Sequence, residues 1–444
     1  MERPHSHSVG RRVRRNRFGL GCAIFIFVYN SLVNLCLLLH FYQPSNQFGD
    51  VLKKVTQECY IPLIKSIKNN KKIKITADFP LSLLEQLDCY GFDFLIRDIK
   101  DLVEAGRIEL AGSAAYHPLL TKIPQDFVDK QIILNESSLA YYFGVNKDFE
   151  GEECFMIKGL RGFFPPEMAI NNQVLETLGG LGYDWISVDE FCLPKESRDI
   201  LENGFIYSLG SKTPKLIVRS RRLTNLISFK RDLDRSAIVT EILKGSADKM
   251  VALDAETFGH HYKDGIYLFE SIISDIFEKG AEVSTITEAI QGVEAVSITH
   301  LNETTWSSTE AEVYPLWENK ASKVNTALWF LQNEVHTEFA SKYPLEAPES
   351  ASSQNGGVPV WKRRYSATPP LLDNRTRVEL DMLKLQQSDQ FWWSTDADMM
   401  GKKNFSRYMI DSVLDYYVEA VTALGSNKVL FDKIDEIRNL IKDQ

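Results

Sequence analysis

Apolar and polar positions follow two rhythms along the first 290 residues. Runs that are apolar throughout or at every second position predict strands, and apolar positions spaced three or four apart predict amphipathic helices. We expect strands at residues 32–39, 72–79, 108–116, 183–190 and 250–259. We expect helices at residues 60–70, 82–91, 92–107, 171–182 and 265–280, and a strand that leads into a helix over 281–290. This alternation indicates a mainly parallel sheet in an α/β protein, either a barrel or a doubly wound sheet.

The pattern changes after about residue 297, where long helical runs replace strand signals. We expect helices at residues 323–339, 377–393, 406–424 and 429–443. A stretch near 343–370 is rich in Pro, Gly and Ser, which predicts a long loop. The chain therefore divides into an N-terminal extension (1–31), a barrel (32–297) and an α-helical C-terminal domain (298–444).

The N-terminal extension places a basic cluster, Arg11, Arg12, Arg14, Arg15 and Arg17, before an apolar run, a pattern typical of a signal peptide or a membrane anchor. If residues 32–39 form a core strand, only 18–29 remain for a membrane, and a spanning helix needs roughly 20 residues. The extension is therefore either a targeting segment of a membrane-anchored or secreted protein, or an upstream extension such as a disordered basic tail.

Composition limits the classes of binding partner and the cellular compartment that we expect. The formal net charge of −9 argues against nucleic acid as a partner, since the phosphate backbone attracts basic proteins. None of the six cysteines belongs to a CxxC pair, so the sequence contains neither a zinc ribbon nor a thioredoxin motif. Cysteines scattered in this way favour a reducing compartment, and we expect a cytoplasmic protein.

Polar residues stand at five expected strand ends, one of which is the segment that precedes Glu167. The carboxyl ends of parallel strands meet at one rim, where such proteins bind their ligands. We expect this rim to gather the following side chains: His40, Gln43, Glu109, His117, Glu167, Asp189, Glu190, Asp254, Glu256, His260 and His261.

Two stretches have features that favour catalysis. In "VALDAETFG" Asp254 stands where the strand leaves the core, and alternation places Glu256 on the same face if the strand continues. Two neighbouring carboxylates raise the pKa of one of them, which suits a general acid; the alternative is that Asp254 caps a following helix. In "LRGFFPPEMAI" two prolines stiffen the backbone before Glu167 and favour extended conformations, which would aim its carboxylate.

These segments together resemble glycoside hydrolase family 57, over roughly residues 32–290. The family's first motif, His-x-His-Gln-Pro, is matched by His40-Phe41-Tyr42-Gln43-Pro44, with Tyr42 in place of the second His. The second motif is matched by "GRIELAGSAAYHP", which makes Glu109 and His117 substrate-binding candidates. The third is matched by "GFFPPEMA", which implies Glu167 as nucleophile. The fourth is matched by "LDAETFG", which implies Asp254 as acid/base and Glu256 as a second acid; the fifth is sought in "STITEAI".

The resemblance implies a distorted (β/α)7 TIM-like barrel followed by a helical domain. It also implies a retaining hydrolase or transglycosylase that acts on α-glucans by double displacement, as do the family's α-amylases, 4-α-glucanotransferases and glycogen branching enzymes. No cofactor or metal is expected, and the expected partner is an α-glucan oligosaccharide or polysaccharide. Further substrate contacts are expected from His40, Gln43, Asp189, Phe258, His260 and Trp393.

Two other classes of protein remain open. Several of the rim residues are metal-ligand types, which would suit a metal-dependent polysaccharide deacetylase. However, no His-x-x-x-His pair follows the acids, and a metal site would not explain Glu167 and its prolines. The replacement at Tyr42 favours the other alternative, a noncatalytic glycan-binding protein on this scaffold.

Overall fold

The computed structural model describes residues 34–144, 160–198, 205–210, 213–229, 235–245, 248–344, 373–395, 398–399, 402–403 and 405–442. These residues belong to one compact unit, Leu32–Gln444. The N-terminal extension and most of the predicted loop near 343–370 lie outside the described residues.

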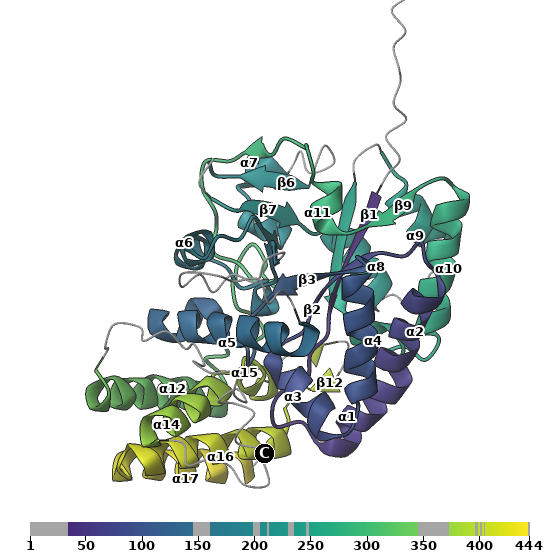
Figure 1. Ribbon diagram of the computed structural model, residues 1–444. Coiled ribbons are helices and arrows are strands. Elements are labelled where there is room, and N and C mark those ends of the chain that lie inside the picture. Colours follow the sequence, from purple (N-terminus) through teal and green to yellow (C-terminus); the bar gives the residue numbers. More distant parts are fainter. Residues whose placement is uncertain are drawn as a thin grey trace, which may run out of the picture. The chain divides into compact units, whose positions relative to one another are not determined.

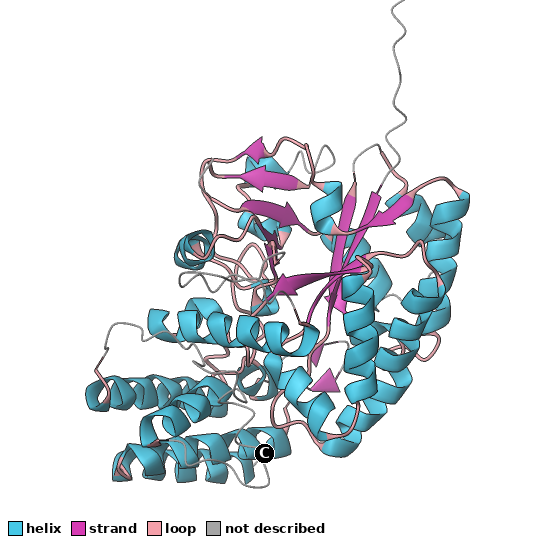
Figure 2. Ribbon diagram, viewed as in Figure 1, coloured by secondary structure: helices cyan, strands magenta, loops and turns pink. Residues whose placement is uncertain are grey.

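One curled sheet forms the centre of this unit (Figures 1 and 2). Its strands are β1 (Asn34–His40), β2 (Ile75–Asp78), β3 (Ile108–Gly112), β4 (Gly162–Phe163), β5 (Trp185–Val188), β6 (Ile206–Ser208), β7 (Lys215–Val218), β8 (Lys249–Asp254), β9 (Glu282–Ser284) and β10 (Val296–Ser297). They follow the order β10-β6-β7-β5-β4-β3-β2-β1-β8, with β9 paired to β1. The pairs are parallel except β6–β7, so the predicted mainly parallel α/β sheet is confirmed as a distorted half-barrel.

Strand β1 shows how the apolar pattern builds this sheet. Parallel strands are buried on both faces, which explains its nearly continuous apolar run. Leu35, Leu37 and Leu39 join the core beneath the outer helices. Cys36 and Leu38 join a second core inside the curl. Since side chains alternate along a strand, His40 follows Leu38 on the inner face.

Helices flank the sheet on its outer side (Figure 2). They are α1 (Gly49–Val55), α2 (Ile61–Asn69), α3 (Leu81–Cys89), α4 (Asp93–Glu104), α5 (Gln125–Phe143), α6 (Asn172–Gly180), α7 (Lys195–Arg198), α8 (Arg221–Phe229), α9 (Arg235–Ile242) and α10 (Gly265–Glu278). The short helix α11 (Ile286–Ala289) differs, because Ile286 and Ala289 belong to the inner core. Strand and helix alternation thus reproduces the predicted pattern, with α5 as a long helix that the pattern did not reveal.

The C-terminal helices form a group of their own in Figure 1, and α5 contacts this group through Gln131 and Lys130. The group comprises α12 (Lys323–Lys342), α14 (Asn374–Leu385), α15 (Asp389–Trp393), α16 (Arg407–Leu424) and α17 (Lys428–Lys442). A short hairpin of β11 (Asp398–Met399) and β12 (Lys402–Lys403) lies between α15 and α16. The single helix predicted for 377–393 is wrong. The helix ends at Leu385 and a new one begins at Asp389, and the three polar residues of this break, Gln386, Gln387 and Ser388, are buried.

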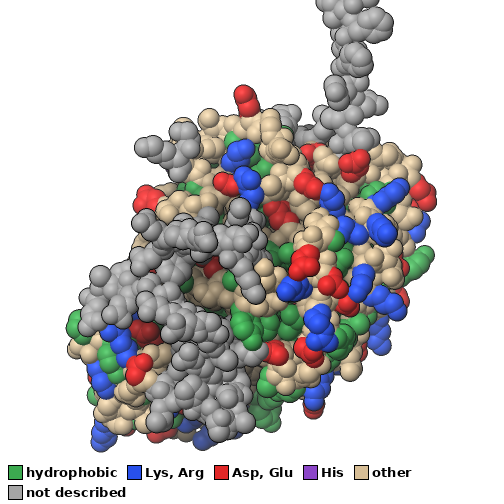
Figure 3. Space-filling model, in the orientation of Figure 1, with side chains coloured by type: hydrophobic (Ala, Val, Ile, Leu, Met, Phe, Trp, Pro, Cys, Tyr) green, Lys and Arg blue, Asp and Glu red, His purple; other side chains and the backbone are tan. Residues whose placement is uncertain are grey.

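The surface carries charges of both signs. On the face drawn in Figure 3, Lys and Arg side chains are interspersed with Asp and Glu over the described residues. No helix in the described ranges is long and apolar enough to cross a membrane.

Candidate active site

Three polar residues end neighbouring strands at the same level. The register pairs His40 of β1 with Asp78 of β2 on one side and with Asp254 of β8 on the other. The Nδ1 atom of His40 lies 2.8 Å from Oδ2 of Asp78, and both side chains are buried. The parallel register therefore forms a row of polar groups, His40, Asp78 and Asp254, which we call the rim row.

The carboxyl groups of the rim row favour the protonated form of His40. Burial alone would lower the pKa of this imidazole, but the charge and hydrogen bond of Asp78, with Asp254 and Glu256 nearby, raise the pKa to about 9. Burial also raises the pKa of Asp78, so the two groups share the proton of their hydrogen bond.

A column of rings surrounds His40. Its ring stacks on His117 at 4.9 Å and on Phe164 at 4.6 Å between centroids, and Tyr42 stacks on His117 at 3.9 Å. Trp306 meets His40 edge-on at 6.3 Å. Burial and the charge of His40 hold the pKa of His117 well below its usual value, so this second imidazole is neutral. The motif residues His40, Tyr42 and His117 therefore form one stacked wall.

Glu167 occupies a sharp turn after β4. Pro165 is extended, as the two prolines predict, and Glu167 and Met168 follow with φ of 59° and 50°. Left-handed backbone at a non-glycine residue costs about 1–3 kcal/mol and persists only where neighbours impose it. Met168 and Ala169 do not begin a helix, which starts at Asn172 instead. The orientation of the Glu167 side chain thus depends on a backbone conformation that neighbouring segments must stabilise.

The Glu167 carboxyl is buried and hydrogen-bonded. Ser388 Oγ donates to Glu167 Oε1 at 2.8 Å, and His117 Nδ1 lies 3.1 Å from the same hydroxyl. When Glu167 is ionised, the hydroxyl proton is committed to it, so Ser388 accepts from His117 Nδ1–H. Burial, together with the negative charges of Asp389 and Asp254, raises the pKa of Glu167 to about 8.

The break between α14 and α15 supplies residues that sequence reasoning missed. Ser388 N–H donates to the His117 carbonyl at 2.9 Å, which docks the break onto the loop after β3. Tyr42 Oη donates to Asp389 Oδ2 at 2.5 Å, and burial raises the pKa of Asp389 to about 6. The available signal was the polar Gln-Gln-Ser run between two apolar helical stretches.

Asp254 ends β8, and the turn Ala255–Phe258 follows at once. Its side chain makes no capping hydrogen bond to that turn, so capping does not occupy its carboxylate. Glu256 lies in the turn rather than on a continued strand. It binds Gln43 Nε2 at 3.0 Å and the Tyr60 hydroxyl, and burial with the charge of Asp254 raises its pKa to about 7.

Three buried nitrogen or oxygen atoms around these acids lack a hydrogen-bond partner within the described ranges. They are His40 Nε2, Asp78 Oδ1 and His117 Nε2. Buried polar atoms are nearly always paired in folded proteins, so unpaired ones in a cluster are suited to bind a ligand.

The side chains of the remaining candidates are engaged with other parts of the protein. Glu109 is near the start of β3, deeper in the sheet, and bonds Thr76 and Thr287. Asp189 is fully buried against Arg219 and Arg221. Phe258 packs in the core on Phe269, and His260 pairs with Glu58 at 3.4 Å. Trp393 is buried among the C-terminal helices.

Two further expectations concern a motif and a metal. "STITEAI", where the fifth motif was sought, forms α11 and its cap beside Glu109 and does not reach the rim row. Within the described part of the chain, no group of three or more His, Cys, Asp or Glu side chains is arranged to hold a metal ion.

The sequence profile of glycosyl hydrolase family 57 matches residues 38–302. This match covers more than half of the chain and includes the rim row and Glu167; the chain belongs to this family. An α-amylase from Pyrococcus furiosus is 22% identical over 233 residues, 51% of this chain and 33% of that protein. A 4-α-glucanotransferase from Thermococcus kodakarensis is 23% identical over 234 residues, 52% and 33% respectively. The chain thus spans about a third of the length of these two relatives.

The C-terminal helices are part of the shared fold. The structure of a branching enzyme of glycoside hydrolase family 57 type, from Pyrococcus horikoshii, superposes with a TM-score of 0.65 at 14% sequence identity. The superposition covers 93% of this chain and 95% of that one. The fold is therefore a distorted barrel with C-terminal helices, as the resemblance implied.

Proposed function

We propose that the protein is a retaining glycoside hydrolase or transglycosylase that acts on α-1,4-linked glucans, with Glu167 as nucleophile and Asp254 as acid/base. The observation that supports this most is the position of the two acids beside the same pair of stacked rings. Asp254 pairs in register with His40. Glu167 Oε1 lies 3.7 Å from Nδ1 of His117, which stacks on His40. The names of the relatives, an α-amylase and a 4-α-glucanotransferase, favour an α-glucan as substrate.

The first step forms a covalent glycosyl-enzyme. A carboxylate oxygen of Glu167 attacks the anomeric carbon, and the bond from that carbon to the glycosidic oxygen breaks. Asp254 gives its proton to the departing oxygen, which leaves as a sugar hydroxyl. Asp254 is then a carboxylate, ready to act as a base.

The second step restores the enzyme. Asp254 removes a proton from water or from a hydroxyl of an acceptor sugar, and the oxygen attacks the anomeric carbon. The ester bond to Glu167 breaks, and the product keeps the original anomeric configuration. Water as acceptor gives hydrolysis, and a sugar as acceptor gives transfer.

Catalysis requires one proton in the pair, on Asp254 rather than Glu167. Mutual repulsion disfavours the state in which both acids are ionised. The hydroxyl of Ser388 and the charge of His40 both lower the pKa of Glu167 and so favour its anion. Burial and the charges of Asp389 and Asp254 act in the opposite direction and outweigh them, so the pKa of Glu167 is about 8, and Ser388 and His40 limit that rise.

Substrate hydroxyls would meet the unpaired atoms of the stacked wall. His40 Nε2 is a donor when the ring is an imidazolium, and His117 Nε2 is an acceptor when Nδ1 carries the proton. A donor and an acceptor on stacked rings are suited to two hydroxyl groups of one sugar. Tyr42, which replaces a histidine of the family motif, uses its hydroxyl on Asp389 instead.

The test is to incubate the purified protein with maltooligosaccharides and to resolve products by chain length and anomeric configuration. Shorter products alone, released as α-anomers, support retaining hydrolysis. Longer and shorter products together support transfer. β-Anomeric products would contradict double displacement, and the absence of any product would contradict the proposed substrate.

A further inference from the structure

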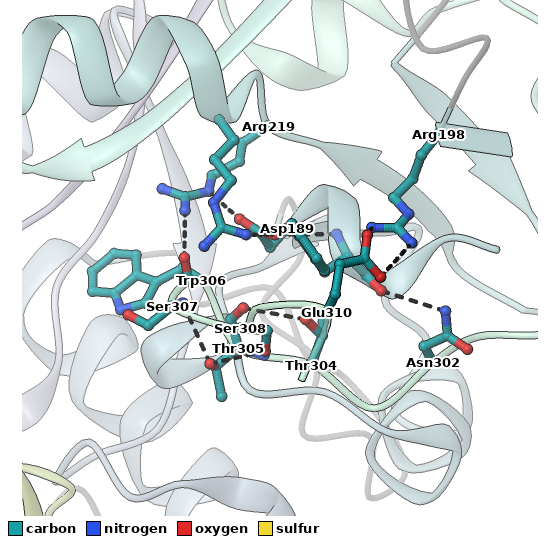
Figure 4. A network of polar contacts seen from close by, with 12 residues as sticks. Asp189, Arg198, Arg219, Asn302, Thr304, Thr305, Trp306, Ser307, Ser308 and Glu310 are labelled. Carbon is teal, nitrogen blue, oxygen red and sulfur yellow. Dashed lines mark hydrogen bonds and ion pairs between the residues drawn. The ribbon is translucent and has the colours of Figure 1, made fainter. Parts of the chain in front are cut away.

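We propose that Arg219 is a positioning residue for the nucleophile, which it holds through the main chain of Trp306, and that Asp189 fixes Arg219 for this task. The inference rests on the proposed role of Glu167. It concerns a polar network beyond the two catalytic carboxyls, shown in Figure 4.

The turn that carries Glu167 needs support from outside. Two consecutive non-glycine residues, Glu167 and Met168, have left-handed backbone, which relaxes unless other segments hold it. Thr304 and Trp306 stabilise it. Ile170 and Thr304 exchange two hydrogen bonds of 3.0 Å, and Trp306 N–H donates to the Glu167 carbonyl at 2.9 Å.

Arg219 contacts both the main-chain carbonyl and the indole ring of Trp306. Its Nη2 donates to the Trp306 carbonyl at 2.7 Å, and its guanidinium lies 5.8 Å from the centre of the indole ring. The main chain of Trp306 therefore makes two contacts. Its N–H donates to the carbonyl of Glu167, and its carbonyl accepts from the guanidinium of Arg219. The indole is also fixed between Arg219 and the rings of His40 and Phe164.

Asp189 keeps Arg219 in this orientation. Arg219 Nε donates to Asp189 Oδ2 at 2.7 Å, while Arg221 and the Phe191 N–H donate to Oδ1 at 3.2 and 3.1 Å. The Asp189 carboxylate is fully buried, and three donors occupy its two oxygens. It is thus engaged within the protein rather than presented to a sugar. A planar guanidinium uses Nε and Nη2 at fixed angles, which a lysine does not reproduce.

Arg198 offers a matched control. It also binds the segment that follows Trp306, through Glu310 at 2.9 Å, but Glu310 is largely exposed. Exposed ion pairs contribute little. In Figure 4 the Arg198–Glu310 pair lies on the far side of Asp189 from Trp306. Loss of this pair should therefore leave the hydrogen bond from Arg219 to Trp306 intact.

The experiment compares Arg219→Met, Arg219→Lys and Arg198→Met with the wild-type protein. Amide hydrogen exchange of the ligand-free proteins is measured on peptides that cover residues 160–175 and 300–310. The kcat and KM values are measured on the maltooligosaccharide that the wild type uses. We expect faster exchange in both peptides for Arg219→Met and a fall in kcat of about 10²-fold, since displacement of a reacting group by about 1 Å costs that much. KM changes by less than about threefold.

Arg219→Lys, which keeps the charge and one donor, should recover part of both losses. Arg198→Met should match the wild type. Unchanged exchange in residues 160–175, an equal effect of Arg198→Met, or a rise in KM with kcat unchanged would each overturn the proposal. If Arg219→Met does not fold, Asp189→Asn takes its place with the same expected pattern.

Failure of this proposal is distinguishable from failure of the proposed function. Hydrogen exchange reports on the hold of the turn without any substrate. If Glu167→Gln remains active, the proposed nucleophile is wrong, whatever the exchange of residues 160–175 shows.

Discussion

Two layers of polar residues lie inside the same curled sheet and differ in how well their atoms are paired. The deeper layer contains Glu109, which accepts hydrogen bonds from Thr76, from the Thr287 N–H and from the Thr287 hydroxyl. The rim row, two residues further along β1–β3, leaves His40 Nε2 and Asp78 Oδ1 without a partner among the described residues.

Burial alone does not tell these layers apart. Burial raises the pKa of Glu109 as it raises that of Glu167. Glu109 is nevertheless satisfied by donors that also anchor α11, and Trp185 Nε1 reinforces the same contact by donating to Thr287 at 2.9 Å. An inward-facing acid is therefore a structural element when its donors belong to the fold, and a candidate for chemistry when its surroundings leave polar atoms unpaired.

The largest expected effect is on the proposed catalytic acids. Glu167→Gln and Asp254→Asn should each lower kcat by at least about 10³-fold, because the first loses its nucleophile and the second its proton donor. Both replacements are nearly isosteric, so circular dichroism spectra should match the wild type. Near-wild-type turnover by either variant would refute the assignment of that residue.

Ser388→Ala tests the contribution of the helix break to the rim. It removes a hydrogen bond to a charged group, which contributes about 1.5–3 kcal/mol, so kcat should fall about 10- to 100-fold. Because Ser388 lowers the pKa of Glu167, its loss should also move the acidic limb of the kcat/KM profile to higher pH. Ser137→Ala on the exposed face of α5 is a suitable control. If the acidic limb of the kcat/KM profile and the kcat value both stay unchanged, Ser388 does not influence the ionisation of Glu167 and its role is only in packing.

Glu109→Ala should affect the deeper layer alone. It leaves buried donors of Thr76 and Thr287 unpaired, which costs about 1–3 kcal/mol in the free energy of unfolding. Urea unfolding measures this loss, and kcat should stay within about threefold of the wild type. A severe loss of turnover without loss of stability would return Glu109 to the substrate-binding role that the resemblance implied.

Asp389→Asn should produce the smallest effect, a shift in pH dependence. The ionised Asp389 raises the pKa of Glu167, so its neutral replacement lets Glu167 ionise at lower pH. Since the proposed nucleophile is active only when ionised, the acidic limb of kcat/KM should move to lower pH. A limb that stays in place would mean that another group controls it.

The sequence predicted much of the fold because the relevant signals are local. The continuous apolar runs of β1 and β8, the alternation in β2 and the helical spacing in α4 and α10 specify these elements without help from distant residues. The antiparallel pair β6–β7 and the break after Leu385 were not predicted. Gln386 and Gln387 are compatible with a helix, and the break is imposed by the contact of Ser388 and Gln387 with the loop after β3.

The candidate site was predictable in part for the same reason. Strand ends indicate that His40, Glu167 and Asp254 share a rim, and the register and turn geometry agree with that expectation; their catalytic roles remain proposals. Alternation gives the face of a residue but not its depth, which is why Glu109 was expected at the rim. Ser388, Asp389 and Arg219 come from segments whose positions only tertiary packing determines.

The break after α14 also has a consequence for the order of folding. The bond from Ser388 to Glu167 joins residues 221 positions apart, and the bond from Tyr42 to Asp389 joins residues 347 apart. Contacts between such distant residues form late, after the loop between them has closed. A ribosome-bound chain that has exposed its whole barrel therefore still lacks Ser388 and Asp389, and the proposed activity should appear only when the break between α14 and α15 has been synthesised and has docked.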